Sequence, residues 1–331
     1  MGTKSNLLMK KGAWRENINL QKIAPVLILL CMVVVLSLAN DQFLQLATFS
    51  NLFQSVAPVG IVAIGAMCVI ITGGIDFSAG YGLAVAGVSA GVLYAKSDFN
   101  IFVLFATGLA VGLLIGLING LVITVLKMPP FVATLAMMSV LQGFALLISQ
   151  GQRLLIEDPA ALWIGQKVFG NFMPASFLLF LGICVVGHLL LTRSKFGLYL
   201  YAMGGNEDAI TYAGVNVAKY KTLVYVFAGF CFGVGSCVTI SRVALISPNI
   251  SGTILMDAIA SAIIGGTSVS GGKGTVFGTI IGTLIMGLIS TTLTYLNVDI
   301  LLRDAVKGGI IILALMLDVL ANKVNEKRAS A

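Results

Sequence analysis

Apolar runs of about 20 residues alternate with short polar or Gly- and Pro-containing breaks along almost the whole chain. A helix of that length crosses the hydrocarbon core of a bilayer once. The pattern predicts ten spans, over residues 23–39, 51–72, 78–95, 101–125, 130–149, 174–192, 222–241, 256–271, 275–296 and 304–321. We therefore expect an all-α polytopic membrane protein with about ten transmembrane helices. The eighth run is short and rich in Gly, so some helices are expected to be broken or re-entrant.

Composition supports this fold class. Hydrophobic residues make up 58% of the 331, charged residues only 10%, and the mean hydropathy is +1.02. A soluble domain carries roughly 25% charged residues, so an ordinary soluble enzyme is excluded. The five cysteines lie inside apolar runs without a C-x-x-C pair, which is typical of small buried side chains and not of a disulfide scaffold.

The net charge of +7 reflects basic residues in the short segments between apolar runs. Fourteen Lys and Arg fall on the face that holds both termini, and six fall on the other face. The positive-inside rule therefore predicts a cytoplasmic tail at 1–22, a transmembrane domain at 23–321 and a second cytoplasmic tail at 322–331. Because membrane topology accounts for these basic residues, we expect no nucleic-acid partner.

The longest polar stretch on the cytoplasmic side covers residues 193–221. Its Gly-Gly break is followed by Asn206, Glu207 and Asp208, which predicts a short helix capped by Asn206 with both acids in its first turn. A short helix projecting from a membrane domain suits the docking of a soluble partner. A plain connecting loop is the alternative interpretation.

Two glycine-rich stretches share a pattern, GGIDFSAGYG at 73–82 and GGTSVSGGKG at 265–274. Gly73, Gly74, Ser78, Gly80 and Gly82 recur 192 residues later as Gly265, Gly266, Ser270, Gly272 and Gly274. Paired breaks of this kind indicate either a transport path or close helix packing. The second stretch lacks the G-x-x-x-x-G-K-[ST] pattern of a nucleotide-binding loop, so we expect no ATP hydrolysis by this chain.

Ionisable residues within or beside the spans are few. Asp76 is predicted to cap the next helix, with contact to a substrate as the alternative, and Asp257 to cap the eighth span. Asp304 and Lys307, spaced i, i+3, are expected to pair with each other. His188 is the only histidine, so no proton-relay chain is expected. Catalytic motifs are absent from the sequence, which predicts a non-enzymatic protein.

Four blocks of sequence resemble bacterial monosaccharide ABC importer permeases of the ribose, galactose and xylose type. The blocks are NLFQSVAPVGIVAIGAMCVIITGGIDFSAG, GLINGLVITVLKMPPFVATLAMM, FGLYLYAMGGNEDAITYAGVNVAKYK and MDAIASAIIGGTSVSGGKGTVFGTIIG, and the resemblance covers roughly 25–320. It implies a multi-pass subunit of the bacterial inner membrane, paired with a second permease protomer, identical or not. It also implies an ABC ATPase subunit that binds ATP and Mg²⁺, a periplasmic sugar-binding protein, and no cofactor in this chain.

The resemblance also implies roles for particular residues. Those expected to contact the ATPase are Gly205, Asn206, Glu207, Asp208 and Ala209. Those expected beside the translocation path are Gln54, Gly73, Gly74, Asp76, Ser78, Asn119 and Gln142. The repeated glycine pattern itself, apart from the resemblance, identifies Gly265, Gly266, Gly272 and Gly274 as glycines expected to break or pack helices. One departure is visible, because family members often carry Glu where this chain has Leu255.

Two other functions remain open at this point. One is a self-contained secondary carrier or channel, which would not need the 193–221 segment in this form. The other is an exporter built on the same scaffold. The identity of the sugar, and whether the second protomer is identical, are not indicated by the sequence.

Overall fold

The computed structural model describes residues 20–98, 100–170, 172–248, 251–299, 302–313 and 316. The expected C-terminal tail and most of the expected N-terminal tail lie outside these residues. The longer helices are α2 (Leu20–Ala39), α3 (Leu46–Ile71), α4 (Ala79–Lys96), α5 (Ile101–Val125), α6 (Pro130–Ser149), α8 (Ala175–Arg193), α11 (Val217–Val243), α12 (Ser251–Ile264) and α13 (Val276–Tyr295). Residues 302–313 are also helical.

Each of the ten predicted apolar runs overlaps one of these helices, and the chain is a mostly helical polytopic membrane protein. Among the described residues, six helices are long and apolar enough to cross a membrane, namely α3, α5, α6, α8, α11 and α13. The count of ten spans therefore stays a prediction. The bounds of the eighth run were wrong, because α12 covers Ser251–Ile264 and ends directly before the Gly265–Gly266 pair.

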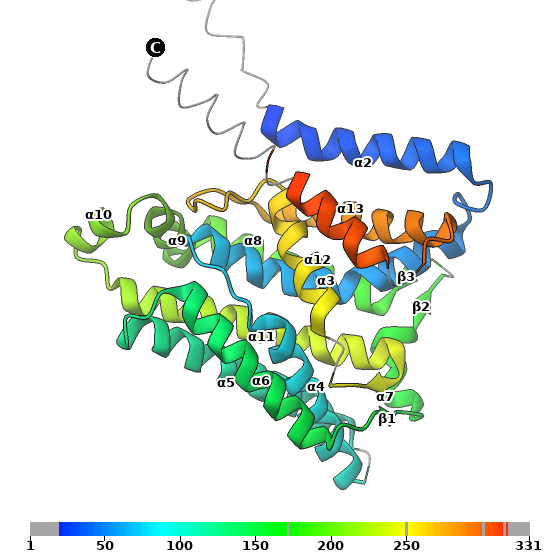
Figure 1. The fold of residues 1–331 in the computed structure, drawn as a ribbon, viewed down its shortest axis with the longest axis horizontal. Coiled ribbons are helices and arrows are strands. Elements are labelled where there is room, and N and C mark those ends of the chain that lie inside the picture. The colour runs from blue at the N-terminus through cyan, green and yellow to red at the C-terminus, as the bar shows by residue number, and fades with distance from the viewer. Residues whose placement is uncertain are drawn as a thin grey trace, which may run out of the picture.

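Helix α3 forms the centre of the bundle. In its most apolar 18-residue window 83% of the residues are buried, and it packs against α8, α11, α12 and α13 (Figure 1). Its residues 56–71 read VAPVGIVAIGAMCVII, in which small side chains let neighbouring helices approach and larger ones such as Ile64 and Met67 fill the core. Because neighbouring helices surround most of α3, they also hold the two ends of this helix in place.

The most extensive helix pair is α5 against α11, and it depends on glycines. A Cβ at Gly112 would lie 2.7 Å from the Cα of Gly233, and a Cβ at Gly116 would lie 3.0 Å from the Cα of Gly229. Glycines four residues apart let two helix backbones touch, which is how helices associate where lipid offers no hydrophobic drive. The opposite side of α5 exposes large apolar residues such as Leu117 and Leu121.

Two small end structures lie at opposite ends of the molecule (Figure 1). At one end are the short helices α9 (Lys195–Gly205) and α10 (Glu207–Tyr212). At the other are α7 (Pro159–Gln166) and two antiparallel pairs of two-residue strands, β1 (Leu154–Leu155) with β4 (Leu245–Ile246) and β2 (Val168–Phe169) with β3 (Met173–Pro174). The sequence predicted neither α7 nor α9.

The carboxylate of Asp158 fixes the start of α7. It accepts hydrogen bonds from the Tyr94 hydroxyl at 2.6 Å and from the Ala160 N–H at 2.9 Å. These two bonds, the Tyr94 bond foremost, lower the pKa of Asp158. The cap is therefore fully formed at neutral pH and is lost only as the pH falls through that lowered pKa.

We predict that Gly112→Leu destabilises the protein by about 1–3 kcal/mol, because the added side chain forces the α5 and α11 backbones apart. Heating the detergent-solubilised protein and measuring the fraction that remains monodisperse checks this. Gly143→Leu on α6 is the matched control, since a Cβ at Gly143 meets no atom within 4 Å. Equal melting of the two variants would contradict the glycine packing.

Candidate coupling surface and translocation path

Helix α10 presents an exposed acidic turn. The Asn206 Oδ1 accepts the Ala209 N–H at 2.9 Å, and Glu207 and Asp208 occupy the first turn. This confirms the predicted short helix capped by Asn206. All five residues from Gly205 to Ala209 are exposed, while Ile210 holds the helix on the bundle with only 8% of its surface accessible.

The two acids of this turn differ in their contacts. Glu207 forms an ion pair with Lys221 of α11 at 2.6 Å, and the Glu207 side chain is about half exposed. Asp208 makes no side-chain bond to any residue that the structure describes. A cavity of about 420 Å³ lies beside the pair, between α10, α11 and the α5–α6 connection that contains Lys127. Glu207 thus anchors α10, whereas Asp208 is directed to contacts outside the chain or to solvent.

Helix α9 touches both glycine-rich stretches. The Tyr201 hydroxyl donates to the Gly274 carbonyl at 2.8 Å, and the Gly272 N–H donates to the Ile71 carbonyl at 2.8 Å. A Cβ at Gly271 would lie 2.8 Å from the Gly204 carbonyl oxygen and 3.1 Å from the Gly73 nitrogen. The end of α3, the end of α9 and the 265–274 loop therefore meet at one point, with no side chain between the backbones.

The two stretches are structural repeats, but shifted by one residue from the sequence match. Helix α3 ends with Gly73 N–H to Ile70 and Gly74 N–H to Val69, and α12 ends with the same pattern at Gly266 and Thr267. Both Gly73 and Gly266 have positive φ, 78° and 90°, as this type of helix cap requires. The equivalent positions are thus 193 residues apart, because Gly265 takes the place of Thr72.

Behind the first stretch lies a buried cluster formed by Asp76, Ser78 and Asn119, which we call the polar cluster. The Asp76 Oδ1 accepts from the Ser78 N–H at 2.9 Å and from the Ser78 hydroxyl at 2.6 Å, and the Asn119 amide donates to the Ser78 hydroxyl at 2.7 Å. The N-cap residue of α4 is Ser78, so the prediction that Asp76 caps this helix was wrong. Asp76 instead holds the N–H and the hydroxyl of that N-cap residue, directly before the helix. No more than 4% of each residue is accessible.

The polar cluster is incompletely satisfied. Asp76 Oδ2, Asn119 Oδ1 and the nearby Tyr225 hydroxyl are buried without a hydrogen-bond partner in the described part of the chain. A buried polar atom without a partner costs about 1–3 kcal/mol, so the cluster retains unused bonding capacity. It joins the break after α3 to α5, and Tyr225 brings α11 against Gly74.

The other residues predicted beside a translocation path lie elsewhere. Gln54 is partly buried on α3, and Gln142 is exposed on α6. Neither makes a side-chain bond to the polar cluster. The structure thus brings together Asp76, Ser78 and Asn119 close to the Gly73–Gly74 break but does not gather all seven residues at one site.

Two further expectations about charged residues were wrong. Lys307 pairs with Asp257 at 2.8 Å and not with its sequence neighbour Asp304. Asp257 lies in the second turn of α12 and does not cap it, because the helix starts at Ser251. Within the described ranges, no three His, Cys, Asp or Glu side chains gather as a metal site would require.

Replacing Asp76 with Ala is expected to lower the free energy of unfolding by about 1–3 kcal/mol, since the Ser78 N–H and hydroxyl lose their acceptor. Asp76→Asn keeps an acceptor oxygen and should cost less. The midpoint of thermal unfolding in detergent measures both, with the exposed Asp41→Ala as control. An Asp76→Ala midpoint equal to that of Asp41→Ala would show that the cluster does not support the fold.

Comparison with known proteins identifies relatives along most of the chain. Residues 48–315 match the family described as branched-chain amino acid transport system, permease component. The chain is 36% identical to the ribose import permease protein of Bacillus subtilis, over 90% of this chain and 93% of the relative. It is 32% identical to the galactose/methyl galactoside import permease protein of Haemophilus influenzae, over 88% and 92%, and 32% identical to the D-allose transport system permease protein of Escherichia coli, over 87% and 88%.

No solved structure matches this chain. The family description refers to amino acids, whereas these relatives carry sugar names.

Proposed function

This chain belongs to the permease family of ABC importers that includes the ribose, galactose and allose permeases, and from that membership we propose that it carries a monosaccharide across the bacterial inner membrane. The observation that carries the proposal is end-to-end similarity to permeases named for several different sugars. A match restricted to one glycine-rich block would indicate much less. Ribose, galactose, allose and L-arabinose are the sugars to test, since the relatives are named for them.

We infer that the α10 end faces the cytoplasm, where an ABC ATPase subunit docks on Gly205 to Ala209. The exposure of these five residues and the unpaired Asp208 support this contact. The α7 end then faces the periplasmic sugar-binding protein, and both termini are cytoplasmic. ATP and Mg²⁺ belong to the ATPase, and this chain is a non-catalytic subunit paired with a second permease protomer.

Leu255, where family members often carry Glu, could affect contact with the periplasmic binding protein only if its side chain were at the surface. Leu255 is 5% accessible and packs in the core of the bundle, so its side chain does not present a docking surface. A Glu there would need a buried partner. The substitution therefore alters helix packing around α12 and not a surface recognised by a binding protein.

In the proposed transport cycle, the two ATPase subunits close against each other when they bind ATP. This closure displaces α9 and α10. Backbone contacts at Gly204 and Gly272 pass the displacement to the ends of α3 and α12, and the Glu207–Lys221 ion pair passes it to α11. ATP can shift the equilibrium between the outward-facing and inward-facing states of the transporter only as far as it binds one state more tightly than the other.

The proposal is tested by purifying the tagged chain from native membranes in mild detergent and identifying the proteins that accompany it by mass spectrometry. An ATPase subunit, together with uptake of one of the four sugars that requires this chain, is the expected result. A chain that purifies alone even after crosslinking would favour the self-contained carrier.

Reversing both charges, Glu207→Lys with Asp208→Lys, is expected to reduce uptake about tenfold and to weaken ATPase association, because the exposed acidic turn loses its complementarity. Radiolabelled sugar uptake and ATPase co-purification measure the two effects. Membrane insertion should be unchanged.

A charge-swap variant distinguishes two roles of Glu207, contact with the ATPase and attachment of α10 to the bundle. Glu207→Lys with Lys221→Glu restores the ion pair but leaves a changed surface charge. Recovery of uptake in the swap would mean that Glu207 acts only by anchoring α10. Normal uptake with normal ATPase association in the double reversal would remove the docking assignment.

A further inference from the structure

An open cavity of about 380 Å³ lies between α3 and α13 at the end of the molecule opposite α10, and we call it the outer cavity. All but one of its lining residues carry a hydroxyl, amide or charged group. They are Thr48, Asn51, Leu52, Ser55, Arg242, Ser290, Thr291, Thr294 and Tyr295. A ligand pocket typically measures about 300–1,000 Å³, so the outer cavity has the size for a small molecule.

The lining follows from helix periodicity on two antiparallel helices. On α3 the residues are spaced 48, 51, 52 and 55, and on α13 they are spaced 290, 291, 294 and 295, so each set shares one helix face. The Thr48 and Tyr295 hydroxyls lie 3.1 Å apart and connect the two faces. Ser and Thr side chains also occur where membrane helices simply pack together, so the assignment of this surface depends on the open volume beside it and on Arg242.

Three hydroxyl groups that line the outer cavity already donate hydrogen bonds to carbonyls of their own helices. Ser55, Ser290 and Thr291 donate their protons to the carbonyls of Leu52, Met286 and Gly287 at 2.8, 3.1 and 2.9 Å. Their oxygen lone pairs are then available to accept from a ligand. A ligand that fits must therefore offer several donors.

Arg242, at the C-terminal end of α11, supplies the complementary donors. It is partly buried, and its guanidinium makes no hydrogen bond or ion pair with any residue described by the structure. A guanidinium has five N–H donors in a fixed planar arrangement. Since the cavity combines these donors with hydroxyl acceptors, it matches a ligand whose groups both donate and accept, which is the property of sugar hydroxyls.

The outer cavity is closed on its inner side. A smaller cavity of about 60 Å³ shares Ser55 and Ser290 with it and is lined by Val56, Val59, Asp257, Thr283, Met286 and Gly287. A Cβ at Gly287 would overlap the side chain of Val56, so α3 and α13 are in tight contact there. The Asp257–Lys307 ion pair lies beside this contact.

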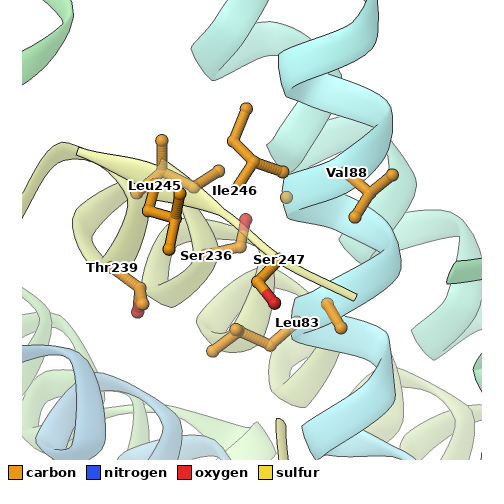
Figure 2. A pocket seen from close by; sticks show the side chains of 10 residues that line it. Leu83, Val88, Ser236, Thr239, Leu245, Ile246 and Ser247 are labelled. Atoms are coloured by element: carbon orange, nitrogen blue, oxygen red, sulfur yellow. The ribbon is translucent and has the colours of Figure 1, made fainter. Parts of the chain in front are cut away.

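Other hollows of the fold fit a sugar site less well. The one between α4, α11 and β4, lined by Leu83, Ser236 and Ile246 among others, has room for only about 10 Å³ (Figure 2). That is the space of a single water molecule. Two further large cavities among the described residues lie against α9 and α10, at the opposite end.

We propose that the outer cavity is a monosaccharide-binding site of the permease itself, which receives the sugar before it passes the Val56–Gly287 contact. This rests on the proposed function. Arg242 donates to sugar oxygens, and Ser55, Ser290 and Thr291 accept from sugar hydroxyls. The site binds a neutral polyhydroxylated ring, and separation of α3 from α13 at Gly287 opens the way inward.

The first test is uptake by the complete transporter in cells, using whichever of ribose, galactose, allose and L-arabinose the unaltered protein transports. Arg242→Leu and Thr291→Phe should each reduce the maximal rate at least tenfold, by removing donors and by filling the cavity. Arg242→Lys should restore part of the rate, and Ser139→Ala, an exposed α6 hydroxyl bonded to its own helix, should change nothing. Uptake at the unaltered rate in both Arg242→Leu and Thr291→Phe would overturn the proposal.

The second test detects occupancy directly and does not depend on transport. In a Cys31→Ser background the four other cysteines are buried, so Ser290→Cys supplies the one accessible thiol among the described residues. The permease, without its binding protein, is treated with a charged methanethiosulfonate. Millimolar concentrations of the transported sugar should slow labelling at least fivefold, and a sugar that is not transported should not.

The outcomes separate the two proposals. If the unaltered transporter takes up none of the four sugars, the proposed function fails, and the assignment of this site fails with it. If uptake is normal but labelling of Ser290→Cys is unchanged by the transported sugar, only the binding site is overturned.

Discussion

The structure depends on one constraint, that a backbone inside a membrane has no water to satisfy its N–H and C=O groups. A helix break in or beside the membrane-spanning part is therefore best completed by the protein itself. Here the breaks after α3 and α12 are closed by the same glycine cap, at Gly73 and Gly266. The Ile71 carbonyl, left free by the end of α3, accepts the Gly272 N–H from the second break. Two interruptions thus satisfy each other, and α9 packs onto them so closely that Gly204 has no room for a side chain.

The sequence was informative where local rules decide the structure. The runs 101–125 and 130–149 are the observed bounds of α5 and α6, since Pro129 directly precedes α6 and Pro130 occupies its first position, which favours proline. Asn206 caps α10 as its side chain allows. The sequence was misleading where distant segments decide. Lys307 bonds to Asp257, 50 residues away, because α12 and the 302–313 helix come together only in the fold. The repeat was placed one residue off because glycine identity, and not the hydrogen-bond pattern, guided the match.

The residues predicted beside the translocation path show the same difference between features decided by local sequence and features decided by distant segments. Asp76, Ser78 and Asn119 attract notice as polar residues in apolar surroundings, and the fold does bring them together, but as a buried cluster that fixes the start of α4. The outer cavity is lined instead mainly by Ser, Thr and Asn, together with Arg242, Tyr295 and Leu52, and these residues form no distinctive sequence motif. Their signal was the spacing 48, 51, 52, 55 facing 290, 291, 294, 295. Recognising it requires knowing that α3 and α13 are antiparallel neighbours, which no local pattern reveals.

The same two helices connect the opposite ends of the molecule. Helix α3 runs from Thr48 in the outer cavity to Ile71 at the junction with α9, and α13 runs from Thr275, beside the Gly274 carbonyl that Tyr201 holds, to Tyr295 in the cavity. A packed helix moves as a unit, because its core contacts allow only discrete arrangements. A displacement of α9 that moved α3 relative to α13 would therefore also alter the contact between these helices at Val56 and Gly287. Coupling between the two ends needs no chain of side-chain contacts, since each helix is itself the connection.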